Sequence, residues 1–291
     1  MSTRTLVSPA ALARPRGRLL HRAALALVLA AFTLAFLGPM YWLVTSGFKD
    51  PQEVIRTPPT LAPQTFEPEN YARAWEVMDL ATLLLNTLYY AFGALAFQLV
   101  LDVAAAYSLS RLRPVLGKAV LGMMLATLMI PATVLVVPQY LTVLDVPVVE
   151  RNLLNTPWAI WLPSVANAFN IFLLKRFFDS IPGELLDAAA MDGATPLRVL
   201  WSVVLPVSRP VLGVVSIFAV VGVWKDFLWP MLTLPDPARQ TLNVGIYSLS
   251  NGVPVNVLIA ALTIASLPAL IIFLVFQRSI MSGLTAGGIK G

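Results

Sequence analysis

Few side chains in this 291-residue chain could take part in chemistry, and the most conspicuous are the adjacent Lys225 and Asp226, which interrupt a long apolar stretch. Lys225 follows Arg209 by about 16 residues, roughly 24 Å of helix, so both charges would lie well inside a membrane span. Charged side chains at such depth face protein or water rather than lipid. We therefore predict that Lys225 and Asp226 line a polar pathway or its gate. A structural ion pair with a neighbouring subunit, or a position at the outer end of a helix, is the alternative.

Uncharged polar and aromatic residues in or near the apolar stretches extend this candidate pathway. The further candidates are Asn86, Asn167, Asn170, Trp224, Phe227 and Trp229. Amide groups can hydrogen-bond a polar ligand, and aromatic rings can stack on it or pack a gate. Hydrogen bonds between helices are the alternative for the asparagines. Asp102 lies in another apolar stretch, where we expect it to pair with a basic residue such as Arg111.

No catalytic residue is predicted. The nucleotide-binding pattern G-x-x-x-x-G-K-[ST] is absent, because Gly117-Lys118 is followed by alanine. The single histidine, His21, lies in a basic N-terminal region, which makes a Ser-His-Asp arrangement untenable. The chain has no cysteine, so a disulfide framework and a thiolate metal site are excluded. We expect no metal and no cofactor in this chain, and any ATP hydrolysis must come from a partner.

The composition is that of a membrane protein, with 58% apolar and only 12% charged residues. A soluble domain of this size would carry about twice that charge, and about 20 apolar residues suffice to cross a bilayer. We predict an all-α fold with six transmembrane helices between a loose N-terminal tail, 1–22, and a C-terminal tail, 283–291. The predicted spans of this domain, 23–282, are 23–47, 81–110, 119–142, 153–174, 210–232 and 256–277. The first is expected to be a retained span, with a cleaved signal peptide as the alternative.

The distribution of basic residues predicts the orientation in the membrane. Fourteen of the 20 Lys and Arg residues fall in the two tails and in the loops at 111–118 and 175–209, whereas five fall in the other loops. Because basic residues collect on the cytoplasmic side, both tails and the 175–209 region are expected in the cytoplasm.

Residues 179–209 contain the longest polar stretch on that side and predict two short helices with a sharp corner between them. Glu184 and Asp187 fall early in the first helix, where the helix dipole favours acids, and Gly193 can end it. Thr195-Pro196 supplies an N-cap and a first-turn proline for the second helix, which Pro206 limits. Exposed apolar residues on such an element indicate a partner interface. An amphipathic connector lying on the membrane surface is the alternative.

These residues resemble the EAA motif of permeases in bacterial ATP-binding-cassette (ABC) importers. In that motif Glu-Ala-Ala is followed by three residues, glycine, nine residues, an aliphatic residue, one residue and Leu-Pro. The chain has Asp187-Ala188-Ala189, Gly193, Val203 and Leu205-Pro206 at these spacings. Asp187 stands where the family usually has glutamate, so the charge is kept on a shorter side chain. We refer to residues 179–209 as the coupling loop.

Other stretches resemble the carbohydrate-importing, maltose-type branch, and within it the smaller of the two permeases. They are SGFK (46–49), ENYARAW (69–75), NTL (86–88), AYSLSR (106–111), IFLLKRFF (171–178), WKDFLWP (224–230) and GLTAGGIKG (283–291). The resemblance implies a type I permease of the bacterial cell membrane that pairs with a second permease and two cytoplasmic ATPase subunits. An external binding protein would deliver a sugar, and ATP and Mg would bind to the ATPases. The C-terminal tail would form a second ATPase contact, with a disordered end as the alternative.

By the same resemblance, the coupling loop would insert a coupling helix into a groove of one ATPase. The predicted ATPase-coupling residues are Glu184, Asp187, Ala188, Ala189, Asp192, Gly193, Val203, Leu205 and Pro206. The alternative function is that of a secondary transporter or ion-coupled channel, and a structural subunit of a membrane complex is a further one. A transporter with inverted repeats finds no support, because 80–110 and 210–232 do not resemble each other.

Overall fold

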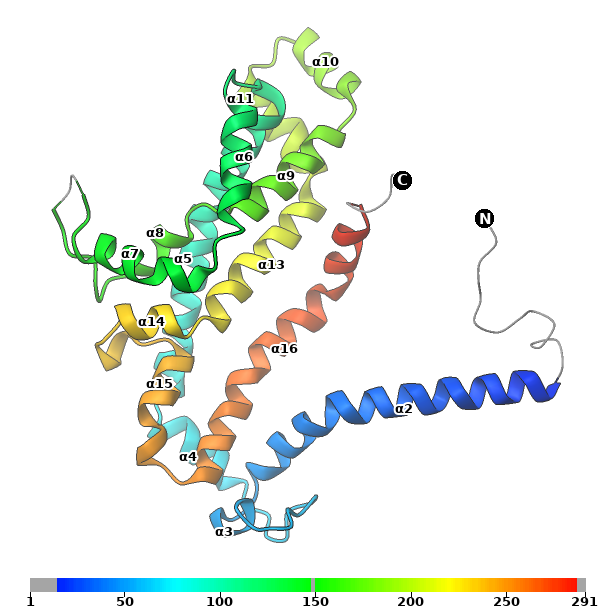
Figure 1. Ribbon diagram of the computed structural model, residues 1–291, viewed down its shortest axis with the longest axis vertical. Helices are drawn as coiled ribbons and strands as arrows, with labels where there is room; N and C mark the ends of the chain where they lie inside the picture. Colours follow the sequence, from blue (N-terminus) through cyan, green and yellow to red (C-terminus); the bar gives the residue numbers. More distant parts are fainter. Residues whose placement is uncertain (1–14, 148–149, 287–291) are drawn as a thin grey trace. The chain divides into compact units, whose positions relative to one another are not determined.

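The computed structural model describes residues 15–147 and 150–286, over which the regular structure is helical apart from an isolated bridge between Val146 and Arg151 (Figure 1). The chain divides into two compact units. The first comprises residues up to Ala74 together with Val253–Thr263, and the second comprises Trp75–Gly252 and the chain from Ile264 onward.

The first unit is built from α2 (Pro15–Ser46), α3 (Pro51–Val54), most of α4 (Glu69–Val77) and the start of α16 (Val255–Ala286). The prediction of a loose tail is wrong for residues 15–22, which are helical. Pro15 is the first helical residue, a position where the missing N–H of proline costs no hydrogen bond. At the other end, α16 continues to Ala286, so residues 283–286 of the predicted C-terminal tail are also helical, while 287–291 lie outside the described residues.

A buried lysine holds the first unit together. Lys49 is 1% exposed, and its ammonium donates a hydrogen bond to the carbonyl of Thr60 (2.6 Å). The Lys49 carbonyl in turn accepts hydrogen bonds from the side-chain amides of Asn70 (3.1 Å) and Asn256 (3.0 Å). These bonds join three segments that are distant in sequence, which explains how a proline-rich loop acquires a fixed structure.

Glu53 fastens the same loop through its buried carboxylate. The carboxylate accepts hydrogen bonds from the Thr60 hydroxyl (2.6 Å) and from the backbone N–H of Gln64 (3.0 Å). Burial raises the pKa of Glu53, but the Thr60 hydroxyl, two backbone N–H groups and the Lys49 charge lower the pKa by more, so it lies below its ordinary value. Because the folded pKa is lower than the unfolded one, ionised Glu53 stabilises the loop above the unfolded pKa, about 4.3.

We expect that stabilisation to disappear as the pH falls through the folded pKa of Glu53. In the wild-type chain, hydrogen exchange at the Gln64 amide should therefore accelerate between pH 5 and pH 3 after correction for the intrinsic rate. Glu53→Gln should show weaker protection at pH 7 and little further change on acidification. Equal protection of this amide at both pH values in the wild type would contradict the role given to Glu53.

The second unit contains the remaining helices, several of which pack against α5 (Leu80–Tyr107). They are η1 (Ser108–Leu112), α6 (Gly117–Thr127), α7 (Ala132–Leu144), α8 (Trp158–Ser164), α9 (Ala168–Ser180), α10 (Gly183–Met191), α11 (Pro196–Val199), η2 (Leu200–Val204), α12 (Leu205–Val207), α13 (Arg209–Lys225), α14 (Leu228–Thr233), η3 (Pro237–Arg239), α15 (Leu242–Leu249) and η4 (Ser250–Gly252). Figure 1 shows α5, α9 and α13 side by side, with α10 beyond their ends. Their shared core includes Tyr107, Leu174, Phe178 and Val215.

Several predicted spans are interrupted. Three described helices, α2, α5 with η1, and α16, are long and apolar enough to cross a membrane alone, and up to five qualify if each of two bent helix pairs forms one span. The third predicted span is interrupted at Pro131, which precedes α7 at a bend of 106°. The fourth span is divided between α8 and α9 and the fifth between α13 and α14. The number of six spans stays a prediction.

Candidate functional site

The predicted corner of the coupling loop is present and has a defined hydrogen-bond pattern. Helix α10 ends at Met191, and Gly193 adopts a left-handed backbone with φ of +75°. The N–H of Gly193 donates to the carbonyl of Ala190 (2.9 Å), and the N–H of Ala194 donates to the carbonyl of Ala189 (3.0 Å). This pair of bonds is the Schellman motif, in which a residue with positive φ satisfies the last carbonyls of a helix.

Helix α10 is attached to the core on one side and free on the other. Leu186 and Ala189 pack against the core of the second unit. Leu185 and Met191, in contrast, are 47% and 89% exposed. The exposed surface of this segment also carries acids and a small residue, namely Glu184, Asp187, Ala188 and Asp192. A free face that combines large apolar and acidic side chains is typical of a protein interface.

The second helix of the loop begins as predicted. The Thr195 side chain accepts a hydrogen bond from the N–H of Arg198, and Pro196 occupies the first turn. The helical run continues through a π-helical segment, η2, and ends at Val207, one residue beyond Pro206. Val203 and Leu205 are half-buried against the core of the second unit. No residue pattern predicted η2, although π-helical turns are common at functional sites.

The end of α5 and η1 hold the coupling loop on both sides of α10, contacts that the sequence did not predict. The Tyr107 hydroxyl donates to the carbonyl of Pro196 (2.8 Å), after the corner. The Arg111 guanidinium donates to the carbonyls of Phe178 and Ile181 (2.9 Å to the latter), before α10. In addition, the Ser110 hydroxyl donates to the Asp179 carboxylate (2.7 Å). We call Tyr107, Ser110 and Arg111 the loop clamp.

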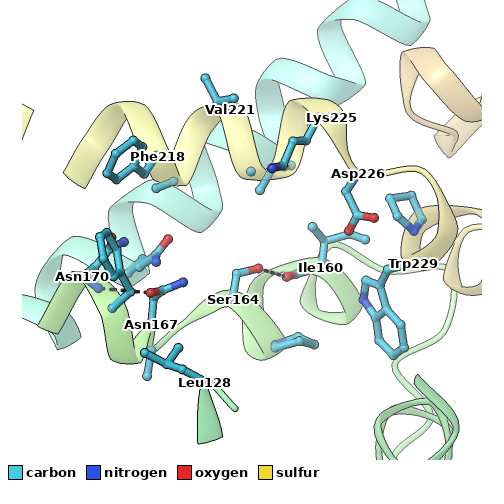
Figure 2. A pocket seen from close by; sticks show the side chains of 18 residues that line it. Leu128, Ile160, Ser164, Asn167, Asn170, Phe218, Val221, Lys225, Asp226 and Trp229 are labelled. Carbon is cyan, nitrogen blue, oxygen red and sulfur yellow. Dashed lines mark hydrogen bonds between the residues drawn. The ribbon is translucent and has the colours of Figure 1, made fainter. Parts of the chain in front are cut away.

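A cavity of about 480 Å³ lies in the second unit, beside the interruption between α8 and α9 and the interruption between α13 and α14. Its polar lining residues are Gln98, Ser164, Asn167, Asn170, Lys225 and Asp226, and its aromatic ones are Phe169, Phe218 and Trp229. Figure 2 shows Ser164 and Asn167, from the α8–α9 region, opposite Phe218 and Lys225 of α13 across this cavity, with Trp229 at one end. Non-helical backbone at membrane depth is tolerated where it lines a water-filled cavity, which fits both breaks.

Five of the predicted pathway residues line the cavity, namely Asn167, Asn170, Lys225, Asp226 and Trp229. Three do not. The Asn86 amide donates to the carbonyls of Ala238 (2.9 Å) and Gln240 (3.1 Å), so it fixes a loop. Trp224 is buried, and the Phe227 ring packs edge-on against Tyr247. Gln98, Ser164 and Phe218 were missed, because isolated polar or aromatic residues in apolar helices carry no specific signal.

The break between α8 and α9 is held by a buried acid. Asp102 is fully buried and accepts a hydrogen bond from the N–H of Asn167 (3.0 Å). The expected pairing of Asp102 with Arg111 is therefore wrong, since Arg111 is occupied by the carbonyls before α10. The Asn167 side chain caps α9 by accepting from the N–H of Asn170 (3.1 Å). The break between α8 and α9 leaves backbone N–H groups without helical partners. The Asp102 carboxylate and the Asn167 side chain accept hydrogen bonds from two of them.

Comparison with known proteins identifies the chain. Residues 98–285 match the model of the family described as binding-protein-dependent transport system inner membrane component. The chain belongs to this family. The matched region of the permease contains the loop clamp, the coupling loop and every residue that lines the cavity.

Individual relatives agree with this assignment. The permease is 33% identical to the sulfoquinovosyl glycerol transport system permease protein SmoH of Agrobacterium fabrum over 259 residues, which cover 88% of this chain and 89% of the relative. It is 30% identical to the diacetylchitobiose uptake system permease protein NgcG of Streptomyces coelicolor, with coverage of 89% and 86%. Among solved structures, a bacterial ABC transporter that imports the acidic polysaccharide alginate has the same fold, with a TM-score of 0.80, 23% identity and coverage of 91% and 98%.

These findings confirm the predicted all-α permease fold and the predicted place in the carbohydrate branch of ABC importer permeases. The protein is a membrane component of a transport system. The roles predicted for the coupling residues and the cavity residues remain predictions.

Proposed function

We propose that this permease forms half of the translocation pathway for a saccharide in an ATP-driven importer. The observation that carries the proposal is the cavity beside the α8–α9 and α13–α14 interruptions. It lies in the same unit as the coupling loop, which has the EAA spacing. The named relatives support a saccharide, because SmoH and NgcG are described as permeases for sulfoquinovosyl glycerol and diacetylchitobiose.

The contacts in the second unit suggest how a push on α10 would reach the cavity. The loop clamp fastens the coupling loop to α5 and η1 before and after α10. Helix α5 packs against α9 and α13, and these two helices reach the cavity at Asn170 and Lys225. ATP-driven closure of an ATPase seated on α10 would therefore move the cavity walls as one body, because packed helices transmit displacement rather than deform continuously.

The partners follow from this role. We propose a second permease, two ATPase subunits that bind ATP and Mg, and an extracytoplasmic sugar-binding protein, while this chain itself is not an enzyme and holds no cofactor or metal. A solved alginate transporter of similar fold, with a TM-score of 0.65, was determined in complex with a pentasaccharide-bound periplasmic protein. The exposed apolar side chains along α2, such as Leu27 and Leu34, would face lipid or the second permease. The basic-residue bias supports cytoplasmic termini and a cytoplasmic α10.

The proposal is tested by purifying the permease with its co-expressed partners and reconstituting the complex in proteoliposomes. An ATPase subunit should co-purify, and uptake of a saccharide with the binding protein present should require ATP on the α10 side. Dissipating proton and sodium gradients should leave uptake intact. Uptake that persists without the ATPase, or that stops when an ion gradient is removed, would favour an ion-coupled transporter instead.

A further inference from the structure

Lys225 is a cation without a direct partner in the cavity. Its side chain is exposed in the single chain, and over residues 15–147 and 150–286 its ammonium makes neither a hydrogen bond nor an ion pair within 4 Å. A lysine ammonium has three donors and no acceptor, so these donors are available to a ligand. No other lysine or arginine lines the cavity.

The neighbouring acid does not satisfy this cation. The Asp226 carboxylate lies near the backbone N–H groups of Phe227 and Trp229, at the start of α14. In Figure 2 the Lys225 side chain runs back along α13, whereas Asp226 lies toward the break before α14. Asp226 attracts Lys225 through space, but among the described residues no ion pair within 4 Å joins the two side chains, so the donors of the ammonium stay available.

Three of the uncharged polar side chains around the cavity already bond to the protein itself. The Ser164 hydroxyl donates to the carbonyl of Ile160, and the Trp229 indole donates to the carbonyl of Ala159 (2.9 Å). The side-chain oxygen of Asn167 caps α9. Lys225 is therefore the group in this cavity with the strongest free capacity to bind a ligand.

We infer that the saccharide carried by this system is anionic and that Lys225 binds its carboxylate, sulfonate or phosphate group. This inference rests on the proposed function, since it names the substrate class of the same cavity. A lysine at membrane depth is costly and marks a functional site when it faces a cavity. A neutral sugar needs no full charge for recognition, whereas an anionic group gains a charge-assisted hydrogen bond from an ammonium. A volume of about 480 Å³ lies within the roughly 300–1,000 Å³ of small-ligand sites.

The inference is tested with the complete complex in proteoliposomes, which contain the second permease and the ATPases and are supplied with the binding protein. The probes are glucuronate, glucose 6-phosphate, a 6-sulfonated glucoside and a disaccharide with a terminal uronate, each beside its uncharged counterpart. The wild type should take up at least one anionic probe tenfold faster than its counterpart. Lys225→Asn should reduce that uptake at least tenfold, and Lys225→Arg should retain at least a third of it. The exposed Lys118, on α6, gives a matched control, and Lys118→Asn should not change the preference.

A second measurement reports on the cavity without the selectivity of the binding protein. Saturation-transfer NMR on the detergent-solubilised complex, with glucuronate and glucose as probes, should show contact with glucuronate that Lys225→Asn removes. Lys225→Met serves in place of Lys225→Asn if the latter does not assemble. ATP-driven uptake of neutral probes alone, or anion uptake and contact that survive both neutral variants, would overturn the inference while the proposed function stands. Absence of ATP-driven uptake of every saccharide would instead overturn the proposed function.

Discussion

Gly193→Val is expected to reduce ATP-driven uptake to below a tenth of the wild-type rate while the permease still inserts in the membrane. Gly193 has a φ of +75°, a conformation that costs an ordinary residue about 1–2 kcal/mol and a β-branched residue more. A change of this size shifts a two-state population roughly 5–30-fold. The Schellman bonds at the end of α10 would open, and α10 would no longer present a rigid face. Uptake per ATP hydrolysed and retention of the ATPase subunit during purification are the measurements.

Two control variants separate backbone strain from side-chain bulk at this position. Apart from Gly193 and its two chain neighbours, no heavy atom of the described residues lies within 4 Å of where a Cβ would be on Gly193, so a clash with them is not the cause of the expected defect. Gly193→Asn should therefore be much milder, because asparagine tolerates the left-handed region. Gly213→Ala, in α13 at a site that is equally open, should be close to wild type. Normal uptake in Gly193→Val, or equal loss in the valine and asparagine variants, would show that backbone strain at the corner is not what matters.

The coupling loop was predictable because its determinants are local. Gly193 supplies the positive φ, Thr195 the cap and Pro196 the first turn, and each acts on residues within a few positions of itself. The motif spacing adds a second local signal. The ends of long helices were predicted less well. Helix α2 begins at Pro15, whereas the first span was predicted to begin at residue 23.

The cavity was predicted only in part because its geometry depends on which helices are broken and what holds the breaks. Lys225 and Asp226 were found because charges are conspicuous in an apolar stretch. Asn86 was predicted as a pathway residue, but it does not line this cavity. Its amide donates to two backbone carbonyls that lie about 150 residues away in the sequence. Asp102 likewise bonds a backbone N–H, which has no sequence signature, 65 residues from its own position.

The loop clamp was missed for the same reason, and its removal is expected to have the second large effect. Arg111 stands within a stretch that resembles the family, but its partners are backbone carbonyls 67 and 70 residues away. Its guanidinium satisfies the C-terminal end of α9, where a cation is also favoured by the helix dipole. Hydrogen bonds to a charged group contribute about 1.5–3 kcal/mol each. Arg111→Ala should therefore destabilise the second unit by about 3 kcal/mol and free the N-terminal end of the coupling loop.

A permease with Arg111→Ala should consequently show a lower melting temperature and an uptake rate below a tenth of wild type, with continued ATP hydrolysis by the assembled complex. Arg111→Lys should fall between the two, because lysine keeps the charge but lacks the planar fork that reaches two carbonyls. Arg113, two positions away, is the matched control, since it is exposed and its Nε donates only to the nearby Ser110 carbonyl (3.2 Å). Arg113→Ala should cost less than about 0.5 kcal/mol. If the two alanine variants have equal effects, loss of positive charge at the membrane surface, rather than loss of the loop clamp, accounts for the defect.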